Sequence, residues 1–196
     1  MSSIYKKGFT LIELIVTMSI VTLLMTTVLF NYGTFNDNLA ISSAEQEMAV
    51  AIRQAQTYGL NVKETAASSG QFGYAYGIYF NPQSPTDYYL FADADNNKKY
   101  DVGSGCGSGS TECIEKFSLR NGVRISNICD SATCYSTKNL NITFLRPVPD
   151  AVIYLINNSD GSTYSSSVNT GKIELTSSKG KVLKVTIEST GQVLVD

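Results

Sequence analysis

The 196-residue chain contains no histidine and no tryptophan. Because histidine is the commonest general base and a frequent metal ligand, its absence removes the usual acid–base and zinc chemistry together. A serine nucleophile would have no imidazole to activate it. Glu112 and Glu115 could pair as acid and base, but they lie beside Cys113 in a polar stretch where we expect both carboxylates to be solvated. The residues therefore predict no catalytic function.

Charged residues are scarce as well, since they make up 16% of the chain, which carries a net charge of −2. Such mild acidity gives no general attraction to nucleic acid or anionic lipid. Four lysines give the C-terminal part a local basic tilt: Lys172, Lys179, Lys181 and Lys184. Glu174 and Glu188 interrupt this group, so we interpret it as a sheet edge protected by solvated lysines. Nucleic acid is not expected as a partner, because phosphate binding needs several cations on one face.

What the chain does have is one long apolar run from Phe9 to Phe30, preceded by Lys6 and Lys7. At 1.5 Å per residue the run makes about 33 Å of helix, enough to cross the hydrocarbon core of a bilayer. A chain this small could not wrap such a helix in a core, which leaves a membrane anchor. The two lysines on the short flank predict a cytoplasmic N-terminus and an exported remainder.

Two details of this run go beyond a plain anchor. Its only charge is Glu13, and a carboxylate in a membrane costs roughly 2.5–3.5 kcal/mol at the centre and less near an end, so it usually marks function. An ordinary secretory signal has a small-residue cleavage site after its apolar core. Here the small residue, Gly8, comes before the core.

The contiguous residues from Lys6 to Leu14, KKGFTLIEL, resemble the class III signal of type IV prepilins and type II secretion pseudopilins. The resemblance implies that a prepilin peptidase cuts between Gly8 and Phe9 and methylates the new N-terminal Phe9. It also assigns Glu13 to filament assembly. Residues 1–8 would be the leader peptide and residues 9–30 the membrane-spanning, filament-core helix.

Where many pilins carry a helix-loosening glycine and proline in this segment, the chain has Thr22 and Phe30, so we expect a more regular helix. Residues 31–38, NYGTFNDN, could kink or briefly open the helix. Apolar residues then recur at three- and four-residue steps and predict an amphipathic helix over 31–59 with a C-terminal stop at Gly59. The stripe expected to face the domain is Leu39, Ile41, Ala44, Met48, Ala51, Ile52 and Ala55, with Glu45, Glu47, Arg53 and Gln54 on the other side.

From residue 70 short apolar and aromatic runs predict antiparallel strands. The candidates are 74–80, 88–92, 114–119, 123–128, 140–145, 151–156, 172–176, 182–188 and 192–195. Thr190 and Gly191 read as a tight hairpin turn, and 103–112 and 157–170 as surface loops. The predicted fold class is α+β, a long N-terminal helix packed on an antiparallel, β-sandwich-like domain over 60–196.

This order of elements is similar to that of the GspH/FimT-type minor pseudopilins. In that group the closing hairpin commonly reads Gly-Arg, whereas this chain has Gly191-Gln192. The resemblance implies the pilin fold.

The cysteines, at 106, 113, 129 and 134, lie in polar, turn-rich sequence. In an exported domain four cysteines suggest two disulfides with three possible connectivities, and proximity favours Cys106 with Cys113 and Cys129 with Cys134. The alternative is a four-thiolate zinc site, which these spacings fit poorly.

A candidate calcium loop follows the 88–92 strand. Its ligands would be Asp93, Asp95, Asn97, Lys99 through its carbonyl, and Asp101. These are positions 1, 3, 5, 7 and 9 of a calcium loop. Lys98 and Ser104 depart from the EF-hand pattern, which needs glycine and a bidentate glutamate there. The alternative is a hairpin loop whose Asp and Asn side chains cap their own backbone. No cofactor is required by this interpretation, with calcium as the possible one.

Together these features predict a minor structural subunit of a type IV pilus or type II secretion pseudopilus. Its partners would be the prepilin peptidase, other pilin or pseudopilin subunits, the inner-membrane assembly platform and the membrane itself. It would start as a single-pass protein of the cytoplasmic membrane with a periplasmic or extracellular domain. The alternatives are a DNA-uptake or adhesive tip subunit, and a membrane-tethered enzyme, which would need a cofactor or catalytic pair.

Overall fold

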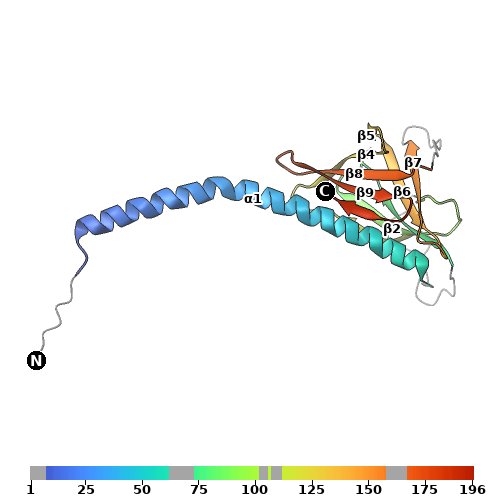
Figure 1. The fold of residues 1–196 in the computed structure, drawn as a ribbon, viewed down its shortest axis with the longest axis horizontal. Coiled ribbons are helices and arrows are strands. Elements are labelled where there is room, and N and C mark those ends of the chain that lie inside the picture. The colour runs from blue at the N-terminus through green and yellow to red at the C-terminus, as the bar shows by residue number, and fades with distance from the viewer. Residues whose placement is uncertain (1–7, 62–72, 102–105, 107–111, 158–166) are drawn as a thin grey trace, which may run out of the picture.

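The computed structural model describes residues 8–61, 73–101, 106, 112–157 and 167–196. One helix, α1 (Leu11–Leu60), runs through the N-terminal part, and its first half projects away from a β-rich domain (Figure 1). The helix is continuous across residues 31–38, so it curves without opening there. The helix is therefore also regular at Thr22 and Phe30, as expected.

Ten strands among the described residues form two five-stranded antiparallel sheets. The first has the order β3-β2-β1-β6-β7, from β1 (Ala75–Phe80), β2 (Asp87–Asp93), β3 (Cys113–Ser118), β6 (Lys138–Phe144) and β7 (Ala151–Asn157). The second has the order β10-β9-β8-β4-β5, from β4 (Arg124–Cys129), β5 (Cys134–Tyr135), β8 (Thr170–Thr176), β9 (Val182–Glu188) and β10 (Val193–Val195). The α+β class is confirmed, and the two-residue β5 is the strand that the sequence did not predict.

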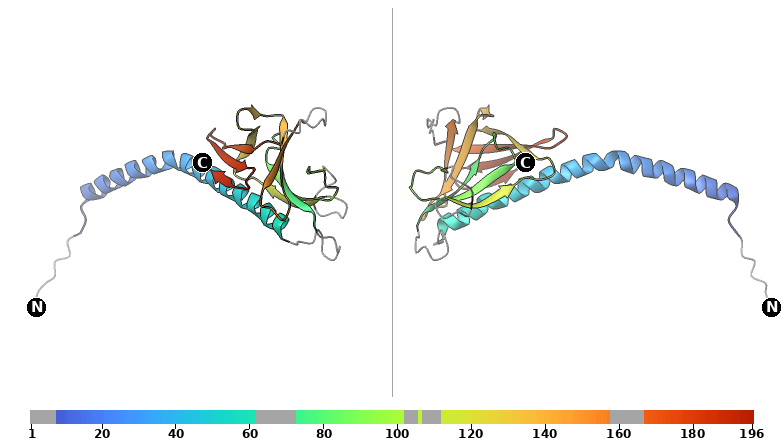
Figure 2. Two further views of the ribbon diagram at one scale, coloured as in Figure 1. Left: turned by 45° about the vertical axis from the view of Figure 1, so that its right-hand side comes forward. Right: turned by 180° about the vertical axis from the view of Figure 1, so that it is seen from behind.

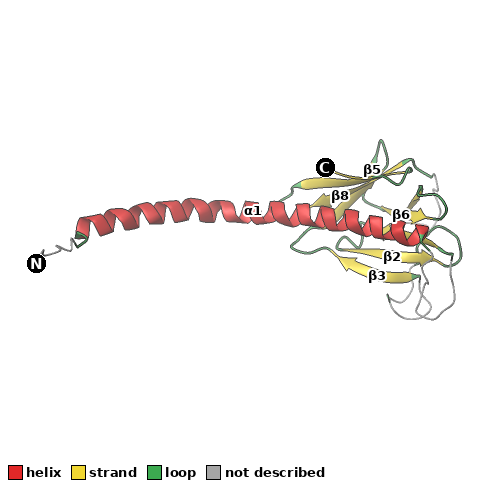
Figure 3. Cartoon of the chain, turned by 60° about the horizontal axis from the view of Figure 1, so that its bottom comes forward, coloured by secondary structure: helices red, strands yellow, loops and turns green. Residues whose placement is uncertain are grey.

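The second half of α1 packs against both sheets (Figures 2 and 3). Ile41, Met48 and Ile52 are fully buried in one cluster with residues of both sheets. The members from the sheets include Ile78, Phe80, Leu90, Ile142, Ile173, Val185 and Ile187. Three- and four-residue spacing places the helix side chains on one face, so this half of α1 completes the core of the domain.

Two predictions for this helix were wrong: Leu39 was expected in the buried stripe, and Glu45 was expected on the solvated side. Leu39 is 51% exposed, because it lies two residues, or about 200° around the helix, from Ile41. Glu45 is buried instead of solvated, and its carboxylate accepts the backbone N–H of Asp196 at 3.0 Å. Burial raises the pKa of Glu45, which the Asp196 N–H and Lys181 partly offset.

Gly59 does not stop the helix, which continues to Leu60 and ends where the N–H of Asn61 bonds to the Thr57 carbonyl. The glycine serves close packing instead. A Cβ at Gly59 would lie 2.5 Å from the Phe144 carbonyl oxygen and 2.8 Å from the Phe144 Cβ. The last turn of α1 can therefore approach β6 only without a side chain at this position.

Candidate functional site

The candidate site begins at the N-terminus of α1, where Thr10 is the N-cap residue. Its Oγ1 accepts the N–H of Glu13 at 3.3 Å and donates to the Glu13 carboxylate at 3.5 Å. Thr10 and Glu13 have the spacing of a capping box, and the threonine hydroxyl makes its half of that motif by accepting the N–H of the third helical residue. The positive end of the helix dipole also favours the Glu13 carboxylate. The spacing Thr-x-x-Glu at residues 10–13 is the sequence signal for this contact.

Gly8 and Phe9 lie before the helix in exposed, non-helical chain, with Phe9 83% exposed. A Cβ at Gly8 would meet no atom within 4 Å, so the packing of the chain itself does not require glycine there. The expected cleavage and methylation at this junction remain predictions. Lys6 and Lys7, expected to set the topology, and most of the 1–8 leader lie outside the described residues.

The apolar side chains of α1 up to Phe30 are all exposed. The hydroxyls among them do not need water, because several return to carbonyls one turn earlier. Thr17 donates to Leu14, Ser19 to Ile15, Thr22 to Met18 and Thr26 to Thr22, at 2.7–2.9 Å. A helix with satisfied backbone and hydroxyl groups is suited to a hydrocarbon surrounding. By length and composition this helix is able to span a membrane.

The domain is fastened to α1 just after this exposed half, at Asp37. The buried carboxylate of Asp37 accepts hydrogen bonds from Ser177 Oγ at 2.5 Å, Ser178 Oγ at 2.6 Å and the Lys179 N–H at 3.2 Å. Hydrogen bonds from Ser177 and Ser178 lower the pKa of Asp37. The sequence did not predict this contact, because Asp37 and the Ser177–Lys179 turn are far apart in the chain. We call it the Asp37 latch.

The predicted calcium loop turns out to be ordered by its own backbone. Asp93 is 1% exposed, and its carboxylate accepts the N–H groups of Asn97 at 3.0 Å and Lys98 at 2.9 Å. Asp95 accepts the Asn97 N–H and side-chain amide. The side-chain oxygen of Asn97 in turn accepts the Lys99 N–H at 2.7 Å. These bonds match the alternative to a calcium site, a hairpin loop whose Asp and Asn side chains cap their own backbone.

The same geometry brings a third carboxylate to the loop, Glu112. Its oxygens accept the N–H groups of Ala94 and Asp101, both at 2.9 Å. Carboxylate oxygens of Asp93, Asp95 and Glu112 lie within 4.8 Å of one another, whereas Asp101 is outside that group. Desolvation raises the pKa values of both Asp93 and Glu112. The expectation that Glu112 is a solvated carboxylate was therefore wrong.

A second apolar cluster holds this loop on the sheet. Tyr100 is buried against Tyr79, Phe91 and Cys113, and it stacks on Tyr89 with ring centroids 5.5 Å apart. The backbone N–H of Tyr100 also donates to the Asn141 side-chain oxygen at 2.9 Å. The loop is thus fixed at its C-terminal end as well as by the Asp93 carboxylate.

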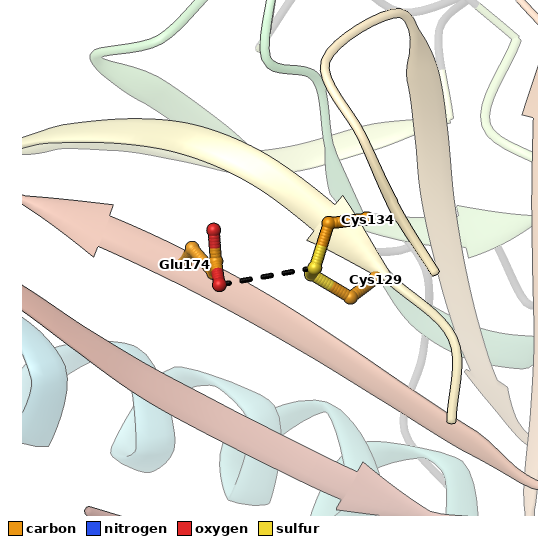
Figure 4. A group of neighbouring side chains, drawn as sticks. All are labelled: Cys129, Cys134 and Glu174. Atoms are coloured by element: carbon orange, nitrogen blue, oxygen red, sulfur yellow. Dashed lines mark hydrogen bonds between the residues drawn. A yellow bond between two sulfur atoms is a disulfide. The ribbon is translucent and has the colours of Figure 1, made fainter. Parts of the chain in front are cut away.

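The cysteines are paired locally, as proximity favours: Cys106 with Cys113, and Cys129 with Cys134. The first bond reaches β3 one residue after Glu112, and the second closes the β4–β5 hairpin. Glu174 lies 3.8 Å from the Cys134 sulfur (Figure 4). Its carboxylate is already held by Lys184 at 3.0 Å and by the Asn127 amide at 2.8 Å. Paired sulfurs and an occupied carboxylate do not suit zinc.

The four C-terminal lysines do not form one face. Lys184 is paired with Glu174 on the β8–β9 sheet surface, whereas Lys179 and Lys181 lie in and beside the turn that contacts α1. The expectation that nucleic acid is not a partner stays a prediction.

A family model described as the prokaryotic N-terminal methylation motif matches residues 4–29. Comparison with curated proteins and with solved structures returns no match. The matched motif is the prepilin-type signal, and it supports the type IV pilin and pseudopilin class. It also favours a structural protein over an enzyme, and it implies processing by prepilin peptidase and assembly with other pilins in the membrane.

Proposed function

We propose that this protein is a minor structural subunit of a type IV pilus or a type II secretion pseudopilus. In the proposal the peptidase removes residues 1–8 and methylates Phe9. The subunit waits in the cytoplasmic membrane with its domain outside, and then enters the filament through the exposed half of α1. The GspH/FimT-type resemblance of the β-rich domain supports the minor-subunit assignment.

The proposal rests on a contrast within α1. Its first half matches the methylation motif and is apolar and wholly exposed, whereas its second half is packed into the core of the domain. An exposed apolar helix of this length needs lipid or other helices around it. The Asp37 latch fixes the domain at the base of that half, so movement of the helix into a filament carries the domain with it.

Glu13 gives the proposal a specific assembly contact. After cleavage the α-amino group of Phe9 lies four residues, about one turn, before Glu13. Glu13 of an incoming chain would meet the Phe9 amine of the chain before it, and pairing would offset the desolvation of both charges. The competing explanation is local, since the Glu13 carboxylate also accepts the Thr10 hydroxyl at the start of the helix.

Two substitutions separate these roles. Gln at the third helical position can still complete a capping box, but it carries no charge. If Glu13 sets the register, Glu13→Gln and Glu13→Leu both accumulate in the membrane and are lost from sheared filaments. If Glu13 only caps the helix, Glu13→Gln assembles normally. Thr17→Leu is the matched control, because its hydroxyl bonds only to its own helix, and it should assemble like the wild type.

The measurement is the ratio of protein in sheared filaments to protein in membranes, with partner pilins co-expressed. Wild-type incorporation of Glu13→Leu would overturn the register role. Abundance of the wild-type chain throughout filaments, instead of at a few copies, would replace the minor-subunit assignment with that of a major subunit.

A further inference from the structure

The end of the domain nearest the exposed half of α1 is formed by two turns in contact. The turn from Ser177 to Lys181 joins β8 to β9, and the turn at Asn121 and Gly122 joins β3 to β4. A Cβ at Gly122 would lie 3.1 Å from the Ser178 Cβ, so the turns touch. Asn121 and Ser178 also line one polar pocket together with Gly33, Asp37 and nearby residues of α1. Figure 1 shows the β8–β9 hairpin reaching back along α1 toward its N-terminal half.

These turns carry or adjoin four exposed cations, Arg120, Arg124, Lys179 and Lys181, which we call the basic end. The ion pairs among the described residues are Lys116–Asp87 and Lys184–Glu174, so none of these four is paired with a carboxylate there. Two of the three acids nearby are turned inward, and the third, Asp196, is exposed. Asp37 is enclosed by the latch, and buried Glu45 binds the Asp196 N–H. A local excess of positive charge therefore faces solvent on a chain whose net charge is negative.

The level of the basic end relative to a membrane follows from its contact with α1. Lys179 Nζ lies 3.2 Å from Thr34 Oγ1, and Thr34 is four residues beyond Phe30. Four residues correspond to about 6 Å of helix, and the headgroup layer outside the hydrocarbon is about 5–8 Å thick on each side. Tyr32 and Phe35, each 60% exposed, mark the same level, because aromatic side chains gather at membrane interfaces.

We propose that the basic end docks on the headgroups of anionic phospholipids in the leaflet beside the domain, before the subunit is taken into a filament. This inference rests on the membrane stage of the proposed function. Lysines within a Debye length of an anionic surface are attracted to it, and each contributes about fivefold to the bound population. Lys179, held at the headgroup level by Thr34, makes the nearest contact, and Lys181 adds to it. Extraction of the helix would break the contact, so docking favours the stored subunit over premature assembly.

Tryptophan fluorescence can test the contact, because the chain has no tryptophan of its own. Val182, 46% exposed beside the β8–β9 turn, and Val148, 50% exposed between β6 and β7, are the two reporter positions. The full chain with Val182→Trp or Val148→Trp is reconstituted into phosphatidylcholine vesicles with or without roughly a third phosphatidylglycerol. Each vesicle contains a small fraction of lipid with a spin-labelled headgroup, which quenches nearby indoles.

If the basic end docks, Val182→Trp should be quenched strongly with phosphatidylglycerol and more weakly without it. Salt at about 0.5 M should reverse the additional quenching, because it screens the surface charge. Adding Lys179→Gln and Lys181→Gln should lower the docked-to-undocked ratio about 25-fold. The charge-matched control, Lys98→Gln with Lys99→Gln in the remote loop, should leave it unchanged. Val148→Trp should be unquenched throughout.

Equal quenching of Val182→Trp in both lipids, unaffected by salt, would overturn the proposal. Quenching that depends on the protein-to-lipid ratio instead of phosphatidylglycerol would also overturn it, and would indicate contact with a second copy. Flotation of the vesicles separates these failures from that of the proposed function. A chain that floats without selective quenching refutes the docking alone, whereas a chain that does not float refutes the membrane stage.

Discussion

The two halves of α1 share one continuous backbone but differ in what surrounds them. Up to Phe30 the apolar side chains are exposed on all sides, whereas Ile41, Met48 and Ile52 are fully buried against both sheets. The first half has apolar residues all round and the second has them on one face. The difference shows that the second half finds its partner within the chain, and that the first half must find its partner in lipid or in other subunits.

The boundary between the halves is chemical as well as geometric. Among the side chains of α1 that the structure describes, Asp37 is the first that is buried, and it lies two residues after the exposed Phe35. A short carboxylate–hydroxyl network therefore marks where the helix ceases to be an anchor and becomes part of a core.

The largest expected effect comes from the same substitution in both halves. Ile52 is fully buried and Ile20 is 55% exposed. Ile52→Ala should lower the free energy of unfolding of the domain by about 2–5 kcal/mol, because it leaves a cavity. Ile20→Ala should change it by less than about 0.5 kcal/mol. Denaturant unfolding of the full chain in mild detergent, followed by near-ultraviolet circular dichroism, measures both. Equal losses would show that the halves are not energetically distinct.

Glycine-to-alanine substitutions should have opposite signs before and after the Asp37 latch. Gly59→Ala should destabilise the domain by about 1–3 kcal/mol, because the added carbon overlaps the Phe144 backbone. At Gly33 a Cβ would meet only the end of the Lys179 side chain, at 2.9 Å, which can swing away. Gly33→Ala should therefore strengthen the helix by about 0.5–1 kcal/mol. Helix content and thermal unfolding report the two signs, and stabilisation by Gly59→Ala would contradict the close packing.

Calcium should change the stability of the domain and leave the exposed half of α1 unaffected. We predict that one calcium ion binds at Asp93, Asp95 and Glu112 and raises domain stability by about 1.4 kcal/mol at ten times its dissociation constant. Isothermal titration calorimetry should show one site that is lost in Asp95→Ala, with Asp87→Ala as the control outside the loop. Absence of heat at millimolar calcium would favour the self-capped loop without a metal.

The pH dependence of this loop has a definite sign. Burial raises the pKa values of Asp93 and Glu112, so the folded chain holds their protons more tightly than the unfolded chain. Without calcium, the contribution of the pair to stability is present at low pH and falls as the pH rises through these raised values. Calcium needs the charged carboxylates, so its stabilising effect should grow over the same range. A calcium effect that is constant from about pH 4 to 6 would contradict this linkage.

Local patterns were sufficient to predict most of the fold. Alternating apolar residues located nine strands to within two residues, and the spacing of Ile41, Ala44, Met48 and Ile52 predicted the buried face of α1. The motif around Gly8 and Phe9 predicted the class that the family comparison supports. The disulfide pairs also follow from short separations along the chain.

The contacts that were missed join residues distant in sequence. The Asp37 latch joins residues 140 positions apart, and Glu45 is bonded to the backbone of Asp196, 151 positions further along the chain. Glu112 reaches the Asp93 loop because β2 and β3 are paired, which its polar neighbours did not indicate. Gly59 was assigned to a helix stop because glycine is common there, whereas its close approach to Phe144 can be seen only in three dimensions.

The central claim, a prepilin-class subunit with a detachable leader before its exposed helix, is tested most directly by the mass of the mature N-terminus. The protein is taken from a host with its matching peptidase, with Gly8→Val as the variant in which cleavage is blocked. We predict that the wild-type chain begins at Phe9 and carries one methyl group on its amine, and that the Gly8→Val chain is not cleaved. A wild-type N-terminus at Met1, or anywhere beyond Phe30, would contradict it.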